Sequence, residues 1–161
     1  MEITAGPSAF LASGSSRRTS TAADGHYHFL DLPDGQYTLA VSLPGSGTRY
    51  GVGTTQVSVS RDVGGKIIMA SADLALPPTT IKGTVTLKNK GDPVILAEVC
   101  VQGSGERTFT DSKGGYVLAG IEANPLGPRR VTATAQGLPT ATNTLQLSLA
   151  GAVEVLNFVL G

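Results

Sequence analysis

The sequence predicts an all-β protein built as two tandem antiparallel β-sandwiches. Three observations predict this: apolar and polar residues alternate along many short segments, glycine and proline separate those segments, and one half of the chain repeats the other. The 161 residues include 21 glycines and 9 prolines, a composition that favours short strands joined by tight turns. This length suits one medium domain or two small ones, and the repeat favours two.

Four segments carry the clearest alternation of period two, which is typical of strands with one buried face. No segment of ten or more residues has the apolar spacing of an amphipathic helix. GKIIMASADLAL (65–76) is interpreted as a connection followed by a strand, because glycine and the Ile-Ile pair disfavour a helix. The four strand segments are YTLAVSL (37–43), TQVSVS (55–60), IKGTVTL (81–87) and TLQLSL (144–149).

The two halves of the chain align as copies of one unit. GSSRRTSTAADGHYHFLDL (14–32) aligns without a gap with GSGERTFTDSKGGYVLAGI (103–121). The proline-containing PPTT (77–80) lies between the copies and is interpreted as a short linker. We therefore predict one domain over residues 1–77 and a second over residues 78–161. Aligned pairs include Gly25 with Gly114, Tyr27 with Tyr116 and, after a three-residue insertion in the second copy, Gly35 with Gly127.

The first copy lacks a counterpart for the first strand of the second copy. The second copy opens with the segment 81–87, a loop and a second strand, AEVCVQ (97–102). In the first copy, residues 7–10 align with that second strand, and nothing before them matches the first. A sandwich without an edge strand exposes unpaired backbone groups. We expect either that the chain is a fragment of a longer protein or that another polypeptide supplies the strand.

The turn motifs of the repeat lead to a family resemblance. TAADGHYHFLDLPDGQYTLAVSLPG (21–45) combines an Asp-Gly turn, an aromatic strand, a Leu-Pro-x-Gly turn and Tyr-x-Leu-x-Val, and IKGTV (81–85) precedes TDSKGGYVLAGI (110–121). These motifs resemble the carboxypeptidase regulatory-like domain. The resemblance implies transthyretin-like Greek-key sandwiches that serve as non-catalytic modules. It also implies that no catalytic residues of the family can be assigned to positions of this sequence. The second copy departs from the pattern at EANPLGPRR (122–130), where Arg129 replaces the tyrosine.

Turn geometry explains why the motif contains these residues. The Asp-Gly pairs supply the positive φ angles of tight hairpins. Pro33-Asp34-Gly35 forms a turn in which proline fixes φ and glycine takes the unusual geometry. The predicted turn and core residues are Gly25, Tyr27, Phe29, Pro33, Gly35, Tyr37, Gly114, Tyr116 and Gly127.

His26 and His28, with Asp24, are the candidate metal ligands. Two histidines that share a strand face can converge on one ion. However, Tyr27 and Phe29 take the inward face, which turns both histidines outward, and the second copy has neither histidine. We interpret the histidines as solvent-facing strand residues and predict no metal or other cofactor.

Other chemistries receive less support from the sequence. The Asp-Gly pairs are interpreted as turns rather than Ca²⁺ ligands, because no run has the closely spaced acidic residues of an EF-hand loop. No G-x-S-x-G elbow is present, and Cys100 is expected to pack as a small apolar residue. Tyr50, beside Arg49, is the ring expected to remain exposed, which makes a poor platform for sugars. No catalytic residue is predicted, and the chain is expected not to be an enzyme.

Charge and hydropathy disfavour nucleic acid and membranes as partners of the chain. The 12 basic and 12 acidic side chains give a formal net charge of zero, so no general attraction to nucleic acid or anionic membranes is expected. No apolar run approaches the roughly 20 residues of a membrane span. The first residues do not form a signal peptide, but a chain that starts inside a domain carries little information on localisation.

The predicted function is a non-catalytic structural and protein-interaction module of a larger surface or multi-subunit assembly protein. Its expected partners are other proteins or other domains of a longer polypeptide, and self-association through an open sheet edge is a further expectation. An extracellular, cell-surface or assembly location is favoured over a soluble cytoplasmic one. Two alternatives remain: an accessory module that binds carbohydrate or Ca²⁺, and a subunit of a phage-tail-like or filamentous assembly that accepts a donated β-strand.

Overall fold

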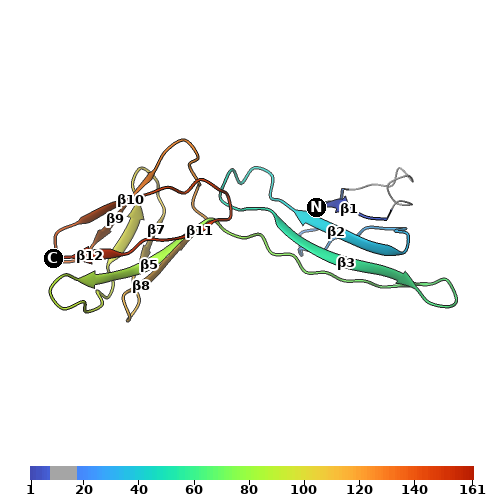
Figure 1. Ribbon diagram of the computed structural model, residues 1–161, viewed down its shortest axis with the longest axis horizontal. Coiled ribbons are helices and arrows are strands. Elements are labelled where there is room, and N and C mark those ends of the chain that lie inside the picture. The colour runs from blue at the N-terminus through green and yellow to red at the C-terminus, as the bar shows by residue number, and fades with distance from the viewer. Residues whose placement is uncertain (8–17) are drawn as a thin grey trace. The chain divides into compact units, whose positions relative to one another are not determined.

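The regular structure of the chain consists of β-strands (Figure 1). The computed structural model describes residues 1–7 and 18–161, and no helix occurs among them. This confirms the all-β class that the alternating pattern predicted. Since the described residues form no helix, none of them forms an apolar helix long enough to cross a membrane.

The chain divides into two compact units. Unit 1 contains Met1–Leu43 and Val52–Leu76, and unit 2 contains Pro44–Gly51 and Pro77–Gly161. The sequence-based division at residue 77 counted residues 44–51 in the first domain, whereas the structure groups them with unit 2. Alternation and turn chemistry cannot predict such an assignment, because it depends on contacts between residues far apart in the sequence.

Unit 2 is a sandwich of two sheets. In one sheet, β5 (Thr80–Leu87) lies between β8 (Gly115–Ala119) on one side and β11 (Val153–Val155) with β12 (Phe158–Leu160) on the other (Figure 1). β5 pairs antiparallel with β8 but parallel with β11 and β12. The sequence predicted antiparallel sheets, and this sheet is instead mixed. The other sheet has the order β10 (Ala141–Leu145), β9 (Arg129–Thr134), β6 (Glu98–Val101) and β7 (Arg107–Phe109).

The core of unit 2 lies between its two sheets. β5 contributes Ile81 and Val85, which are fully buried, and the facing sheet contributes Val99 and Val131. Fifteen buried apolar residues form this cluster. The predicted strand 144–149 ends at Leu145, although Leu147 beyond it is fully buried. Alternation thus predicted the burial of Leu147 correctly, but Leu149, on the same predicted face, is 72% exposed.

The described residues of unit 1 form one sheet, in which all neighbouring strands are antiparallel. Tyr37 and Leu39 of its second strand point into the core, as the alternation predicted, while Leu43 is half exposed beyond the strand end. Among residues 1–7 and 18–161, five buried apolar residues form this core. The order of the strands is β1 (Glu2–Ala5), β2 (Gly35–Val41), β3 (Gly53–Arg61) and β4 (Ile67–Ile68).

β1 occupies the position that the repeat assigned to residues 7–10. It pairs antiparallel with β2, as β6 pairs with β9 in unit 2. An isolated bridge joins Glu2 to Arg18, and its counterpart in unit 2 joins Cys100 to Arg107. The strand therefore lies nearer the N-terminus than a gapless alignment predicts. Of the segment assigned by the alignment, residues 8–10 lie outside the described part of the chain.

Candidate functional site

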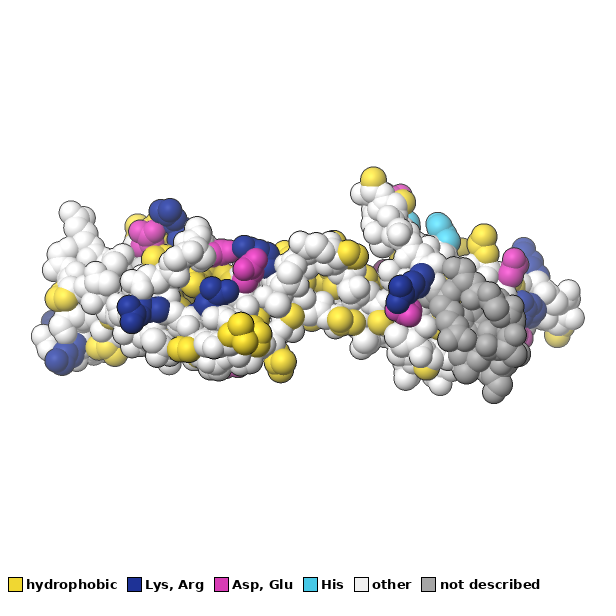
Figure 2. Space-filling view, turned by 90° about the horizontal axis from the view of Figure 1, so that it is seen from above, with side chains coloured by type: hydrophobic (Ala, Val, Ile, Leu, Met, Phe, Trp, Pro, Cys, Tyr) yellow, Lys and Arg dark blue, Asp and Glu magenta, His cyan; other side chains and the backbone are white. Residues whose placement is uncertain are grey.

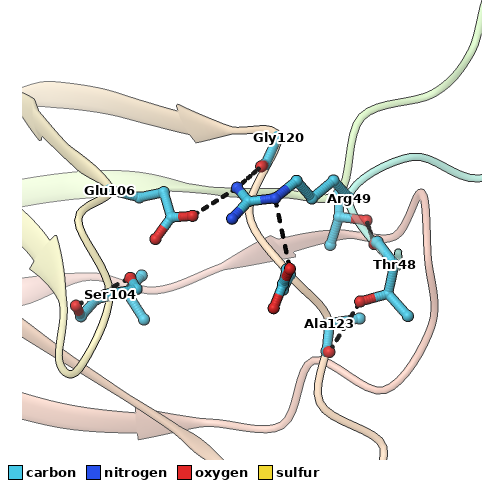
Figure 3. Close-up of polar contacts among 9 residues, drawn as sticks. Thr48, Arg49, Ser104, Glu106, Gly120 and Ala123 are labelled. Atoms are coloured by element: carbon cyan, nitrogen blue, oxygen red, sulfur yellow. Dashed lines mark hydrogen bonds and ion pairs between the residues drawn. The ribbon is translucent and has the colours of Figure 1, made fainter. Parts of the chain in front are cut away.

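The densest polar cluster of unit 2 surrounds Arg49, in the segment Pro44–Gly51 (Figure 3). Arg49 Nη1 donates to Glu106 Oε1 at 2.5 Å and to the carbonyl oxygen of Gly120 at 2.7 Å, and Nε lies 3.6 Å from Glu122 Oε1. Hydrogen bonds from Ser104 and from Arg49 hold the pKa of the Glu106 carboxyl below its ordinary value. The guanidinium is thereby shared among three oxygen acceptors of the same unit.

Two threonines hold the backbone of the same segment. The fully buried Thr79 Oγ1 donates to the carbonyl oxygen of Thr48 at 2.7 Å and accepts from the amide of Gly151 at 2.7 Å. Thr48 Oγ1 donates to the carbonyl oxygen of Ala123 at 3.0 Å. Each bond satisfies a backbone group that would otherwise be left without a partner. The side chains of this cluster therefore hold backbone groups of unit 2 in place.

Sequence reasoning missed this cluster. The Tyr50 ring is exposed, as expected, but nothing in the sequence indicated that the neighbouring Arg49 is engaged by carboxylates. Arg49 and Glu106 lie 57 residues apart and belong to no common motif. No signal in the sequence links them, because the pairing exists only once the segment packs on unit 2.

The structure brings two of the three candidate metal ligands together. Asp24 Oδ2 lies 3.3 Å from His26 Nδ1, and Asp24 Oδ1 accepts the amide of His26 at 2.9 Å. Both side chains are more than half exposed, and His28 is also exposed. Within residues 1–7 and 18–161, no group of three or more His, Cys, Asp or Glu side chains is placed to hold a metal ion. The Asp24 contact closes the local turn.

The two Asp-Gly-type turns have matching geometry. Gly25 has φ of 84° and donates to the carbonyl oxygen of Ala22 at 3.0 Å, while Gly114 has φ of 73° and donates to the carbonyl oxygen of Asp111 at 3.0 Å. In the Pro33 turn, Gly35 has φ of 145°, and an added Cβ there would lie 2.2 Å from Pro7 Cγ. Only glycine allows both this positive φ and the close approach of Pro7. Gly127 has no positive φ and lies in a half-buried loop.

The aromatic residues anchor segments across each unit. Tyr27 donates to the carbonyl oxygen of Ala72 at 2.6 Å, and Tyr116 donates to that of Leu156 at 2.6 Å. The Tyr27 and Phe29 rings pack edge to face, with centroids 6.2 Å apart. Burial raises the pKa of the Tyr116 hydroxyl to about 12. Tyr37, fully buried, donates to the carbonyl oxygen of Pro33 at 2.7 Å.

A groove of about 770 Å³ lies in unit 1 and runs alongside these aromatic residues. Its two rims are the segments 24–32 and 69–73, neither of which is assigned to a strand. The groove also carries three carboxylates and both histidines, and none of the described residues that line it is Lys or Arg. Its floor is formed by Leu39, Val57 and Val59 of the sheet.

Other charged residues form local pairs on each unit. Arg18 pairs with Glu2 at 3.2 Å, and its counterpart Arg107 pairs with Glu98 at 3.3 Å. On the face shown in Figure 2, basic and acidic side chains lie interspersed. Such exposed pairs contribute little to stability. Their mixed signs agree with the net charge of zero.

The two-sheet packing, with its polar groups committed to backbone, defines a β-sandwich module. Residues 80–161 match the carboxypeptidase regulatory-like domain. The chain belongs to this family, whose domain is a regulatory, non-catalytic β-sandwich.

Comparisons with other proteins add the following. A comparison with curated proteins gives no match. Among solved structures, one described as the Bacillus anthracis TIE protein aligns over 81% of this chain, with 13% identity and a TM-score of 0.40. The chain spans about a quarter of that protein's length, since the alignment covers 26% of it.

Proposed function

We propose that this chain is a non-catalytic structural and protein-interaction module within a larger surface or multi-subunit assembly protein. The observation that carries the proposal is the cluster around Arg49. Its charged side chain is engaged by Glu106, Glu122 and a backbone carbonyl, and its neighbours hold backbone. A cluster whose contacts join Arg49 to two carboxylates and a backbone carbonyl of the same unit stabilises a fold.

The contacts of the aspartates also favour this proposal over Ca²⁺ binding. Asp62 Oδ1 accepts the amides of Gly64 and Lys66, each at 2.9 Å, and so closes its own turn. Asp34 pairs with Arg61. Carboxylates already used by backbone amides and by an arginine are poor candidates for coordinating a cation.

Two experiments test the proposal. The purified chain, incubated with panels of ester, peptide, glycoside and phosphate-ester substrates, is expected to show no turnover above a heat-unfolded control. Turnover that disappears in His26→Ala or Asp24→Ala would contradict the proposal. In the source cells, proximity labelling of the tagged full-length gene product is expected to identify neighbouring proteins of one assembly. Size fractionation is expected to place the gene product in a high-mass fraction, and external protease is expected to cleave it. A freely diffusing intracellular monomer would contradict that arm.

A further inference from the structure

We infer that the groove of unit 1 is the acceptor site for a β-strand with the residue pattern of β5, supplied by a polypeptide segment outside residues 1–161. This inference rests on the proposed function and deepens it, because it names the chemistry of the interaction partner.

The first argument compares the two units. In unit 2, β5 separates β8 from β11 and β12 and hydrogen-bonds to all three. By the repeat, their counterparts in unit 1 are residues 26–30, 69–71 and 74–76. The last two follow because DLAL (73–76) aligns with NFVL (157–160), and the same gapless alignment places Ala72 on Leu156 and 69–71 on 153–155. None of these segments is assigned to a strand, and no backbone hydrogen bond joins 26–30 to 69–76 among the described residues. The two rims therefore flank the position that a strand fills in unit 2.

Burial supports the same comparison. Tyr116, Leu118 and Phe158 are at most 4% exposed beside β5. Their counterparts Tyr27, Phe29 and Leu74 keep the alternation but are only partly buried. An added strand would remove this remaining apolar surface from water, which favours its binding.

The spacing of the rims is set by the same hydrogen bond in both units. Tyr116 reaches the carbonyl oxygen of Leu156, and Tyr27 reaches that of Ala72, each at 2.6 Å. The repeat aligns both the tyrosines and the residues that accept these bonds. In unit 2, β5 lies between the two segments that the Tyr116–Leu156 hydrogen bond connects. The two segments that the Tyr27–Ala72 hydrogen bond connects in unit 1 are therefore suitably spaced for a strand between them.

The space between the two rims also requires a glycine in the bound strand. Gly83 pairs with Tyr116 in the register of β5 and β8. A Cβ added to Gly83 would lie 2.0 Å from the carbonyl oxygen of Leu156, the same atom that accepts the tyrosine bond. The partner strand therefore needs glycine opposite Tyr27, with apolar residues at the positions of Ile81 and Val85.

Charge adds a further preference. Among the residues that the structure describes, the groove is lined by Asp24, Asp31 and Asp73 and by no basic side chain. A basic residue on the outward face of the strand, as Lys82 is in β5, complements these carboxylates. The partner is thus an extended segment of about eight residues that resembles TIKGTVTL.

The test uses the intact chain and a fluorescent peptide with the sequence of Thr80–Leu87. Anisotropy is expected to show saturable binding, and hydrogen exchange is expected to show new protection at residues 26–30 and 69–76. The matched control peptide replaces the glycine at position 83 with alanine and should bind at least about tenfold more weakly. A second control has the same composition in shuffled order and should not bind.

Several results would overturn the inference. They are absence of binding, equal affinity for the glycine and alanine peptides, or protection elsewhere in the chain. Light scattering that shows a stable homodimer undisturbed by excess peptide would assign the groove to a second copy. Failure of peptide binding with the chain still found in a high-mass assembly would overturn this inference alone. Turnover of a substrate would instead overturn the proposed function.

Discussion

Replacing Thr79 with valine tests whether the segment 44–51 is held by side-chain hydrogen bonds. Valine keeps the shape of threonine but removes its hydroxyl. The hydroxyl is fully buried, donates to Thr48 and accepts from Gly151, with both bonds at 2.7 Å. Its loss leaves a carbonyl and an amide without their partner, so the variant isolates the energetic contribution of these two bonds.

The magnitude follows from the two bonds. Each contributes about 1 kcal/mol net, and leaving partly buried partners unsatisfied adds to the cost. We expect the free energy of unfolding of unit 2 to fall by about 2 kcal/mol or slightly more. For a domain of this size, that corresponds to a decrease in Tm of roughly 8–16 °C.

The assay is thermal and urea unfolding of the full chain, with hydrogen exchange used to assign each transition to a unit. The control is Thr142→Val, because Thr142 is exposed on β10. The control should change stability by less than about 0.5 kcal/mol. Equal effects of the two substitutions would refute the reasoning, as would an unchanged exchange rate of the Gly151 amide, which loses its acceptor.

Three further predictions follow from the contacts of unit 2. Gly83→Ala should destabilise the unit by about 3 kcal/mol, because its Cβ meets the carbonyl oxygen of Leu156, whereas Gly105→Ala, in open space, should be nearly neutral in the same unfolding assay. Arg49→Ala should lower the urea midpoint of unit 2 through loss of the Glu106 bond, whereas Arg107→Ala, at an exposed pair, should leave this midpoint nearly unchanged. The folded-state pKa of Tyr116 is raised to about 12, so its contribution is complete below pH 10, the unfolded pKa, and is lost as the pH rises to about 12. Urea titrations should show about 2 kcal/mol less alkaline destabilisation in Tyr116→Phe than in the unsubstituted chain, and parallel pH profiles would contradict this.

Local patterns predicted much of the fold. The alternation around Tyr37 and Leu39 predicted a strand with these two residues buried, because the side-chain period of a strand is independent of what it packs against. The glycines at positions 25 and 114 predicted turns with positive φ, since such backbone geometry is set by the residue itself. The pattern did not place the strand at Glu2–Ala5, because the gapless alignment assigned residues 7–10 to that position.

The polar contacts were less predictable. Asp24 and His26 are neighbours in sequence and meet within their own turn. Arg49 and Glu106 meet only after two distant segments pack together. The parallel pairing of β12 with β5 was also missed, since alternation carries no information on the direction of a neighbouring strand.

The sequence by itself determined the all-β class, the family resemblance and the buried face of the main strands, because these depend on residue periodicity and turn chemistry. Only the tertiary structure decided that residues 44–51 belong to unit 2, that one sheet is mixed, and that the segments 24–32 and 69–73 border a groove. The physical reason is that these features depend on long-range contacts, whose partners are fixed when sheets pack and backbone groups find their hydrogen bonds.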